Sequence, residues 1–252
     1  MAGRGVFGAI PDVAVFADTQ WEPENVYVWL DKLEAAGRNA PNYIPIARIT
    51  RGSLRDAVFR NENSTGQRFA SIPRFTLAAD GSKGMGRRQC THEFKIAPIR
   101  AYTRGLMGYA KGKRVKKHGA EVWIGISTDE AVRAKPARDA WQTNRWPLIE
   151  LGYSREDCLA WMADNYPELG VPPKSACIGC PFHSDAHWAD MRANDPVSWA
   201  EAVAADKAIR NQPKTNTEQF AHATRVPLDR VTFREAANAQ HFNNECEGMC
   251  GV

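Results

Sequence analysis

The chain has 252 residues, which is enough for one large domain or two small ones. Its hydrophobic content of 43% is ordinary for a soluble globular protein, and the absence of any run of about 18 apolar residues excludes a membrane-spanning helix. The N-terminus has no charged segment followed by an apolar one, so no secretory signal is visible. A formal net charge of +4 is mild and does not by itself indicate a nucleic-acid partner.

Predicted strands and helices alternate along the chain. The first strand is the apolar run at residues 12–17, which leads into Asp18 and Thr19. The further predicted strands cover residues 43–49, about 74–77 and 121–126. The predicted helices cover residues 24–36, about 53–61, 91–108, 155–165, 185–192, 197–210 and about 232–239. This alternation predicts an α/β fold with a mostly parallel sheet.

We expect residues 1–150 to form a nucleotide-binding-type α/β core. Residues 151–252 are expected to form a helical, cysteine-rich, metal-binding part that packs on this core as one domain. In parallel sheets, ligands bind outside the C-terminal ends of the strands, where Asp18 and Asp129 are expected. Their carboxylates either hold a ribose, an adenine amine or Mg²⁺, or they cap the next helix or turn.

Cys177 and Cys180 stand three positions apart, so one loop can present two thiolates to a metal centre. Cys90, Cys246 and Cys250 are distant in sequence and can complete a set of four thiolates. Such a set suits either zinc or an iron–sulfur cluster. Cys246 and Cys250 compete for the fourth position. Because six cysteines occur in a long chain without a visible secretory signal, we expect metal-binding or catalytic thiols in a reducing cytoplasm.

Basic side chains accompany one of these cysteines. Arg87 and Arg88 next to Cys90 favour its thiolate form, because a positive charge lowers a thiol pKa. Together with Lys95 and Arg133, they are candidates for pairing with phosphate or sulfate oxygens. A second, denser basic run at residues 111–118 is either a solvated loop or a contact for phosphate or nucleic acid.

Three further residues have a simpler interpretation. Cys158 lies within the predicted helix at residues 155–165 and is interpreted as a small core residue. His183 and His187 follow the cysteine pair closely. They either contribute to a His–Cys zinc site or provide polar surface.

Several of these segments, in this order, resemble elements of the phosphoadenylyl-sulfate (PAPS) reductases. Residues 15–24, Val-Phe-Ala-Asp-Thr-Gln-Trp-Glu-Pro-Glu, resemble their strand with its Asp-Thr-Gly and Pro-Glu-Thr elements. Residues 87–99 resemble their Cys-x-x-x-x-Lys-x-x-Pro segment, and residues 125–133 resemble their strand-end element. Cys177 and Cys180 correspond to the second cysteine pair of the cluster-bearing adenylyl-sulfate reductases, and residues 245–250 loosely resemble their C-terminal Glu-Cys-Gly tail.

The resemblance implies the doubly wound adenine-nucleotide α-hydrolase-like fold, and it is strongest to the phage and bacterial PAPS-reductase-like branch. It favours a 4Fe–4S cluster over zinc, with Cys90, Cys177, Cys180 and Cys250 as the ligands. It also implies an adenine nucleotide, ATP or PAPS, with or without Mg²⁺. The residues expected to hold this nucleotide are Asp18, Thr19, Arg87, Arg88, Lys95, Asp129 and Arg133.

Two activities follow from the resemblance. In sulfonucleotide reduction, the thiolate of Cys246 attacks the sulfur of the nucleotide, and a thioredoxin-like reductant then releases sulfite. In sulfur transfer, ATP adenylates a nucleic acid or small acceptor, and a cluster-bound or persulfide sulfur displaces AMP. The alternative is a non-catalytic, zinc-stabilised α/β module that binds nucleic acid or a protein partner. We expect a cytoplasmic protein of a bacterial host or a phage-infected cell. The sequence is compatible with either a monomer or a homodimer.

The family's phosphate loop has no counterpart in this sequence. In the family, a strand and a Ser-Gly-Gly-x-Asp-Ser loop precede the Asp-Thr strand, and the loop's backbone N–H groups cradle the phosphates. Here residues 3–8 are interpreted as the end of the family's first helix and its following turn, so that Met1 is an internal start. Because the missing strand is central in the doubly wound order, we expect its absence to expose apolar surface and to weaken the sheet.

Overall fold

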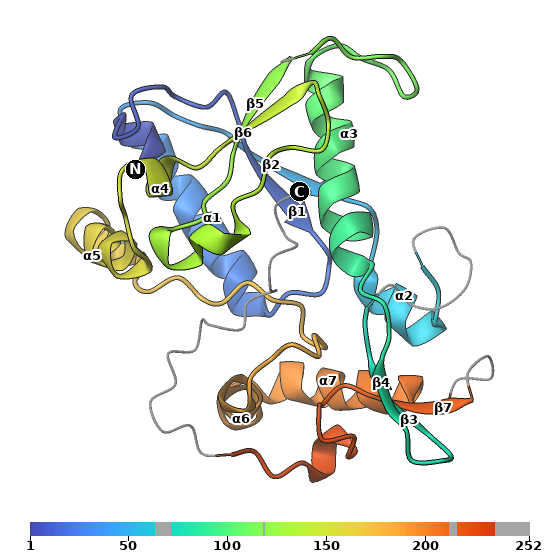
Figure 1. Cartoon of the computed structure of the whole chain (residues 1–252). Helices are drawn as coiled ribbons and strands as arrows, with labels where there is room; N and C mark the ends of the chain where they lie inside the picture. The colour runs from blue at the N-terminus through green and yellow to red at the C-terminus, as the bar shows by residue number, and fades with distance from the viewer. Residues whose placement is uncertain (64–71, 118, 212–215, 235–252) are drawn as a thin grey trace.

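Three small sheets and the helices around them make up a mixed α/β fold (Figure 1). The computed structural model describes residues 1–63, 72–117, 119–211 and 216–234. The strands are β1 (Ala14–Asp18), β2 (Ile46–Thr50), β3 (Phe75–Ala78), β4 (Lys83–Met85), β5 (Ala120–Trp123), β6 (Gln142–Arg145) and β7 (Thr217–Phe220). The α-helices are α1 (Glu24–Arg38), α2 (Leu54–Arg60), α3 (Ala97–Leu106), α4 (Pro147–Glu150), α5 (Arg155–Asn165), α6 (Asp185–Asn194) and α7 (Pro196–Ile209). Shorter helical turns are η1 (Ala2–Arg4), the π-helical η2 (Thr91–Ile96), η3 (Thr128–Arg133), η4 (Pro167–Leu169) and η5 (Leu228–Arg230).

The sequence predicts one mostly parallel sheet, whereas the described strands form three separate sheets. β1 and β2 form one parallel pair, with Ala14 opposite Ile46, and β5 and β6 form another. β3 pairs in the antiparallel sense with both β4 and β7. Across the residues that the structure describes, the predicted mostly parallel sheet is therefore present as two separate parallel pairs, and the third sheet is antiparallel.

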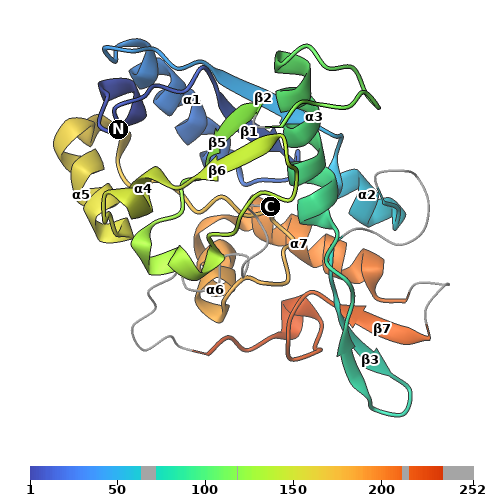
Figure 2. The ribbon, with the colours of Figure 1, turned by 45° about the horizontal axis from the view of Figure 1, so that its top comes forward.

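A cavity of about 820 Å³ lies between the two parallel pairs. Val15 of β1, Val122 of β5 and the α3 residues Ile99 and Leu106 are among its lining residues. Figure 2 shows helix α3 next to both pairs. Neighbouring strands of one sheet must lie close enough to exchange backbone hydrogen bonds. β1 and β5 both line this cavity, and in the described part of the chain they do not pair with each other.

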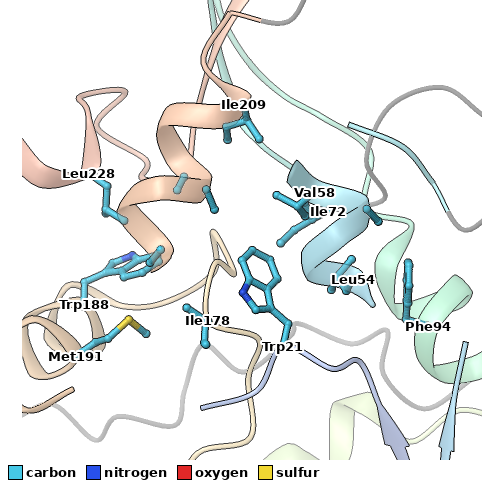
Figure 3. Close-up of a cluster of buried hydrophobic side chains, with 14 residues drawn as sticks. Trp21, Leu54, Val58, Ile72, Phe94, Ile178, Trp188, Met191, Ile209 and Leu228 are labelled. Carbon is cyan, nitrogen blue, oxygen red and sulfur yellow. The ribbon is translucent and has the colours of Figure 1, made fainter. Parts of the chain in front are cut away.

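The largest buried cluster joins segments from both halves of the sequence (Figure 3). Trp21 lies between Leu54 and Val58 of α2 on one side and Trp188 of α6 on the other, and Ile209 of α7 closes the cluster. Each of these five side chains is at most 2% exposed. Burying one large apolar side chain contributes roughly 1.5–3 kcal/mol. The cluster therefore ties α6 and α7 to α2 and to the turn that follows β1.

The predicted helices are largely confirmed. The helix predicted at residues 155–165 is α5, and its start is fixed by a capping box in which Ser154 and Asp157 exchange hydrogen bonds. α1, α2, α6 and α7 begin and end within about two residues of their predicted bounds, as is usual for helix ends. The segment predicted as one helix over residues 91–108 is η2 followed by α3. In the described part of the chain, we find no helix with the length and apolar character needed to cross a membrane.

The sequence predicts a helical C-terminal part. In the structure this part also contains a strand, β7. Phe220 of β7 lies opposite Phe75 of β3, which is far away in the sequence. A four-residue strand with such a distant partner leaves little local signal. The predicted helix near residues 232–239 extends into residues outside the described part, and residues 232–234 are not helical.

Candidate metal centre

The loop that carries Cys177 and Cys180 is hydrogen-bonded to the turn at the C-terminal end of β1. The backbone N–H of Ile178 donates to the carbonyl oxygen of Trp21 over 2.9 Å, and Thr19 Oγ1 lies 3.3 Å from Cys177 Sγ. Within the loop, the Cys180 N–H donates to the Cys177 carbonyl oxygen over 2.9 Å, which closes a tight turn. The predicted cysteine loop and the predicted strand end are thus parts of one site.

Gly179 permits this close approach. A Cβ atom at Gly179 would lie 2.3 Å from Cη2 and 2.8 Å from Cζ2 of the Trp21 ring, both far inside ordinary contact distance. Trp21 is itself held in place, since its Nε1 donates to Glu201 over 2.5 Å. Only glycine therefore fits between the two cysteines with the loop in this position.

Three of the predicted ligands, Cys90, Cys177 and Cys180, lie in the same region of the fold. Cys90 stands at the start of η2, and Cys90 and Cys177 both pack against the main buried cluster. Burial raises the pKa of Cys177 above its ordinary value, with a contribution from the negative charges of Glu22 and Cys180. Burial also raises the pKa of Cys180 to about 11, and the nearby thiol of Cys90 adds to this shift. The metal-free thiols of Cys177 and Cys180 are therefore neutral at pH 7, and a bound cation would stabilise their deprotonated form.

Glu22 lies buried beside Cys177 and Lys95. It was not among the predicted site residues. Its carboxylate, 1% exposed, pairs with Lys95 Nζ over 3.8 Å and accepts a hydrogen bond from Ser175 Oγ over 3.2 Å. Cys177 Sγ lies 3.8 Å from the same carboxylate. The position of Glu22 in the Asp-Thr-Gln-Trp-Glu sequence after β1 was the available signal. Its role is to hold Lys95 beside the cysteines.

Arg74 is the second residue that the sequence analysis missed. It precedes β3, is 4% exposed, and donates through Nη1 to the Gly179 carbonyl oxygen over 3.2 Å. Its Nε and Nη2 atoms are buried and have no hydrogen-bond partner among the described residues. Burial lowers the pKa of Arg74 to about 10, so the guanidinium remains charged at pH 7. Because an unsatisfied buried donor costs about 1–3 kcal/mol, these two nitrogens indicate an acceptor that the described residues do not supply.

The predicted arginines near Cys90 occupy different environments. Arg88 lies over the ring of Phe182, 5.2 Å from its centroid, and its charge acts against the rise in the Cys180 pKa. Lys95 acts on Cys180 in the same direction. Arg87 is exposed at the surface. Two of the predicted basic residues, Arg88 and Lys95, thus lie around the cysteine loop.

The two predicted strand-end carboxylates lie in different surroundings. Asp18 accepts hydrogen bonds from the Tyr27 hydroxyl over 2.9 Å and from the Gln20 N–H over 2.7 Å, which orders the turn beside the cysteine loop. Asp129 accepts from the Arg155 N–H over 2.6 Å at the start of α5, and this bond holds the pKa of Asp129 below its ordinary value. The contacts of Asp129 are therefore those of a helix cap.

Arg133 of η3 pairs with Glu130 of the same turn. Asp129 and Arg133 thus both make local contacts within or next to η3. Of the predicted nucleotide-binding residues, Asp18, Thr19, Arg88 and Lys95 are the ones that accompany the cysteines.

The histidines beside the cysteine pair support the loop. His183 Nε2 lies 3.0 Å from the Cys177 carbonyl oxygen, and its ring meets Trp188 edge-on at 4.6 Å. Burial lowers the pKa of His183 well below its ordinary value, so the ring is neutral. The His187 ring lies 4.1 Å from that of His183. His183 is thus a buried structural residue that helps to fix the loop.

The described cysteines do not by themselves complete a metal site. Cys246 and Cys250 lie outside the described residues, so the fourth thiolate is not placed. Within residues 1–63, 72–117, 119–211 and 216–234, no three His, Cys, Asp or Glu side chains form a group that could hold a metal ion. A single zinc ion draws its sulfurs to about 2.3 Å, whereas a cluster accepts thiolates from more widely separated positions. Cys90, Cys177 and Cys180 are soft sulfur donors, which are the ligand type that an iron–sulfur cluster takes.

Comparisons with protein-family models, with curated proteins and with solved structures gave no match. The function is therefore inferred from the residues of the site and from the sequence resemblance. The features that bear on it are the cysteine loop at the end of β1, Cys90 beside it, and the basic side chains around both.

Proposed function

We propose that this chain is a PAPS-reductase-like protein that binds a 4Fe–4S cluster through Cys90, Cys177, Cys180 and Cys250 and acts on an adenine nucleotide. The observation that carries the proposal is the docking of the cysteine loop on the turn at the C-terminal end of β1. That end of a parallel strand is where α/β proteins bind their ligands. The proposal includes the doubly wound sheet of the adenine-nucleotide α-hydrolase-like fold, to which the parallel pairs β1–β2 and β5–β6 would belong.

The residues around the cysteines prepare the site for negative charge. Deprotonated thiolates in a buried position need positive charge nearby, and Arg88, Lys95 and Arg74 supply it. Glu22 pairs with Lys95 and thereby fixes where its ammonium lies. When bound, the cluster would supply iron sites that transfer electrons or hold sulfur. The protein's contribution is to exclude water and to hold the ligands in place.

The same cations can serve the nucleotide. Lys95 keeps 29% of its side chain exposed, so it can face both the buried Glu22 and a ligand above the strand end. Arg and Lys at such a position pair with phosphate or sulfate oxygens. In the reduction route, the Cys246 thiolate forms a bond to the sulfur of the nucleotide, and the sulfur–oxygen bond to the phosphate breaks. A thioredoxin-like thiol then displaces sulfite. In the transfer route, the sulfur goes to an adenylated nucleic acid or small acceptor.

One observation favours a second candidate, a zinc-stabilised module that binds nucleic acid. The basic run has exposed side chains at Lys111, Lys113, Arg114, Lys116 and Lys117. Clustered exposed cations attract polyanions without any catalytic site. In this candidate the cysteines hold zinc and serve only to stabilise the fold.

Metal analysis of the purified protein tests the proposal and separates the two candidates. After anaerobic reconstitution with iron and sulfide, we expect iron and acid-labile sulfide in the chain and broad absorbance near about 400 nm. Cys177→Ser should lose both, whereas Cys158→Ser should keep them, because Cys158 lies in α5 away from the loop. A colourless wild-type protein that contains zinc and no iron contradicts the proposal and favours the binding module.

Nucleotide binding is tested separately. We expect the reconstituted protein to bind PAPS or ATP, and to catalyse ATP–pyrophosphate exchange if the transfer route is correct. Lys95→Ala should weaken nucleotide affinity, and Lys117→Ala, in the exposed basic run, should leave it unchanged. Equal affinities in the wild type and both variants would remove Lys95 from the nucleotide site.

A further inference from the structure

The buried side chain of Arg74 uses only part of its hydrogen-bonding capacity. Among the described residues, the side chain donates one hydrogen bond, which runs from Nη1 to the Gly179 carbonyl oxygen in the loop between Cys177 and Cys180. Nε and Nη2 are also buried, and they have no partner among the described residues. Buried polar groups in folded proteins almost always have a partner. Two unpartnered nitrogens on a residue that is only 4% exposed therefore indicate a missing acceptor at this position.

The nearby carboxylate is not that acceptor. Asp206 lies within electrostatic reach of Arg74. Its oxygens, however, accept hydrogen bonds from the backbone N–H groups of Ala221 (2.7 Å) and Leu228 (3.0 Å), and it pairs with Arg210. Cys90 and Cys180 also lie within electrostatic reach of Arg74, and they become negatively charged when their thiols are deprotonated. Sulfur is therefore the acceptor that the surroundings offer.

Arg74 is hydrogen-bonded to both chain segments that carry these cysteines. The Arg74 carbonyl oxygen accepts from the Gly86 N–H over 2.8 Å, so the β3–β4 hairpin returns the chain to Arg74 just before it continues to Cys90. Through its side chain, Arg74 holds the Gly179 carbonyl oxygen of the other ligand loop. One residue thus contacts both segments that carry cysteine ligands, although these segments are far apart in sequence.

We propose that Arg74 is a positioning residue of the metal centre, whose Nε and Nη2 donate hydrogen bonds to sulfur once Cys90 and Cys180 carry the cluster. This inference rests on the proposed iron–sulfur function. The planar fork of arginine can reach two acceptors at once, which the ammonium of lysine does in a less directed way. Hydrogen bonds to the sulfurs raise the reduction potential of a cluster and help to retain it.

Three variants test this role in the reconstituted full-length protein. Arg74→Met removes charge and donors, and Arg74→Lys keeps the charge with fewer directed donors. Arg225→Met is the matched control, because the Arg225 side chain also donates to backbone carbonyls, those of Thr76, Ala223 and Gly84. Its partners lie on the β3–β4 hairpin and in the segment after β7, and not in the cysteine loop. The measurements are iron and sulfide per chain, the rate of iron loss to a chelator, the midpoint potential, and the thermal unfolding of each metal-free protein.

We expect Arg74→Met to lose iron about 10- to 100-fold faster than the wild type, which is the usual effect of removing a residue that supports the ligands. Its midpoint potential should shift to a more negative value, Arg74→Lys should lie between the two, and Arg225→Met should match the wild type. This order of midpoint potentials, from the wild type through Arg74→Lys to Arg74→Met, separates the proposed role from general destabilisation. General destabilisation would lower the unfolding temperature of Arg74→Met and Arg225→Met alike.

The outcomes distinguish this inference from the proposed function. A folded Arg74→Met or Arg74→Lys protein that keeps the wild-type potential and rate of iron loss overturns the inference and leaves the cluster proposal standing. A wild type that binds zinc but no iron overturns the cluster proposal. The rate of zinc loss from the same variants then decides the role of Arg74, with the same 10- to 100-fold criterion. If the wild type binds neither metal, both are overturned.

Discussion

Gly179 is the residue whose replacement tests the close packing of the cysteine loop most directly. In the folded chain, the added Cβ of Gly179→Ala would lie 2.3 Å from the Trp21 ring, whereas carbon atoms in contact are about 3.5–4.0 Å apart. The ring is buried and is hydrogen-bonded to Glu201, so it has little freedom to withdraw. The loop or the ring must therefore move by about 1.2–1.7 Å to restore an ordinary carbon–carbon contact.

The expected loss of stability follows from this displacement. Overpacking a buried position costs about 1–3 kcal/mol. A shift of the loop would also weaken the Ile178 N–H bond to Trp21 and the Arg74 bond to Gly179, each worth about 0.5–1.5 kcal/mol. We therefore expect Gly179→Ala to lower the free energy of unfolding by about 2–4 kcal/mol. That is a large part of the 5–15 kcal/mol that is typical of natural domains.

Urea denaturation of the metal-free protein measures this change. Gly105→Ala is the matched control, because Gly105 lies within α3 and an added Cβ there meets no atom within 4 Å. Alanine should raise the unfolding free energy at Gly105 by about 0.5–1 kcal/mol, since glycine is the poorer helix former. A Gly179→Ala protein within about 0.5 kcal/mol of the wild type would refute the argument from close packing.

Further predictions concern the helix cap of α5 and the carboxylate of Asp206 in α7, which accepts a hydrogen bond from the residue directly after β7. Ser154→Ala should lower the unfolding free energy by about 1 kcal/mol in urea denaturation, and an unchanged value would contradict the cap. Hydrogen bonds from Ser154 hold the pKa of Asp157 below its ordinary value. Its contribution to stability is therefore present above the unfolded pKa of about 3.9 and is lost as the pH falls through the lower folded value, so Asp157→Asn should remove this part of the acid transition followed by circular dichroism. Asp206→Ala leaves the N–H groups of Ala221 and Leu228 without their acceptor and should cost about 3–5 kcal/mol. Hydrogen exchange should become faster at these two amides, and unchanged protection would contradict the role of Asp206 as their acceptor.

The parts of the fold that depend on neighbours in sequence are predictable from the sequence. α5 is an example, because its cap, Ser154 with Asp157, and its first turn lie within a few residues of one another. The strand ending at Asp18 and the stiff loop with Cys177 and Cys180 are likewise visible as local patterns. In each case the interacting groups are separated by a few bonds of backbone, so the pattern of side chains carries the information.

In the candidate site, the sequence predicted the cysteine loop, the strand end with Asp18 and Thr19, and the cations Arg88 and Lys95, but not Glu22 or Arg74. Arg74 could not be found from the sequence, because nothing near it in the chain distinguishes it from a surface arginine beside a strand. Its burial and its bond to Gly179 depend on how the β3–β4 hairpin and the cysteine loop pack together. The interpretation of Asp129 had two alternatives, and its bond to the Arg155 N–H is the contact expected of a cap.

By itself, the sequence determined that this is an α/β chain with a loop able to present two thiolates, because hydrophobic alternation, helix caps and short cysteine spacing act over a few residues. The tertiary structure decided that this loop rests on the end of β1, that Trp21 leaves room only for Gly179, and that β1 and β5 are separated by a cavity. These contacts join residues that are distant along the chain. They exist only because burial of the shared apolar cluster brings α2, α6 and α7 together around one turn.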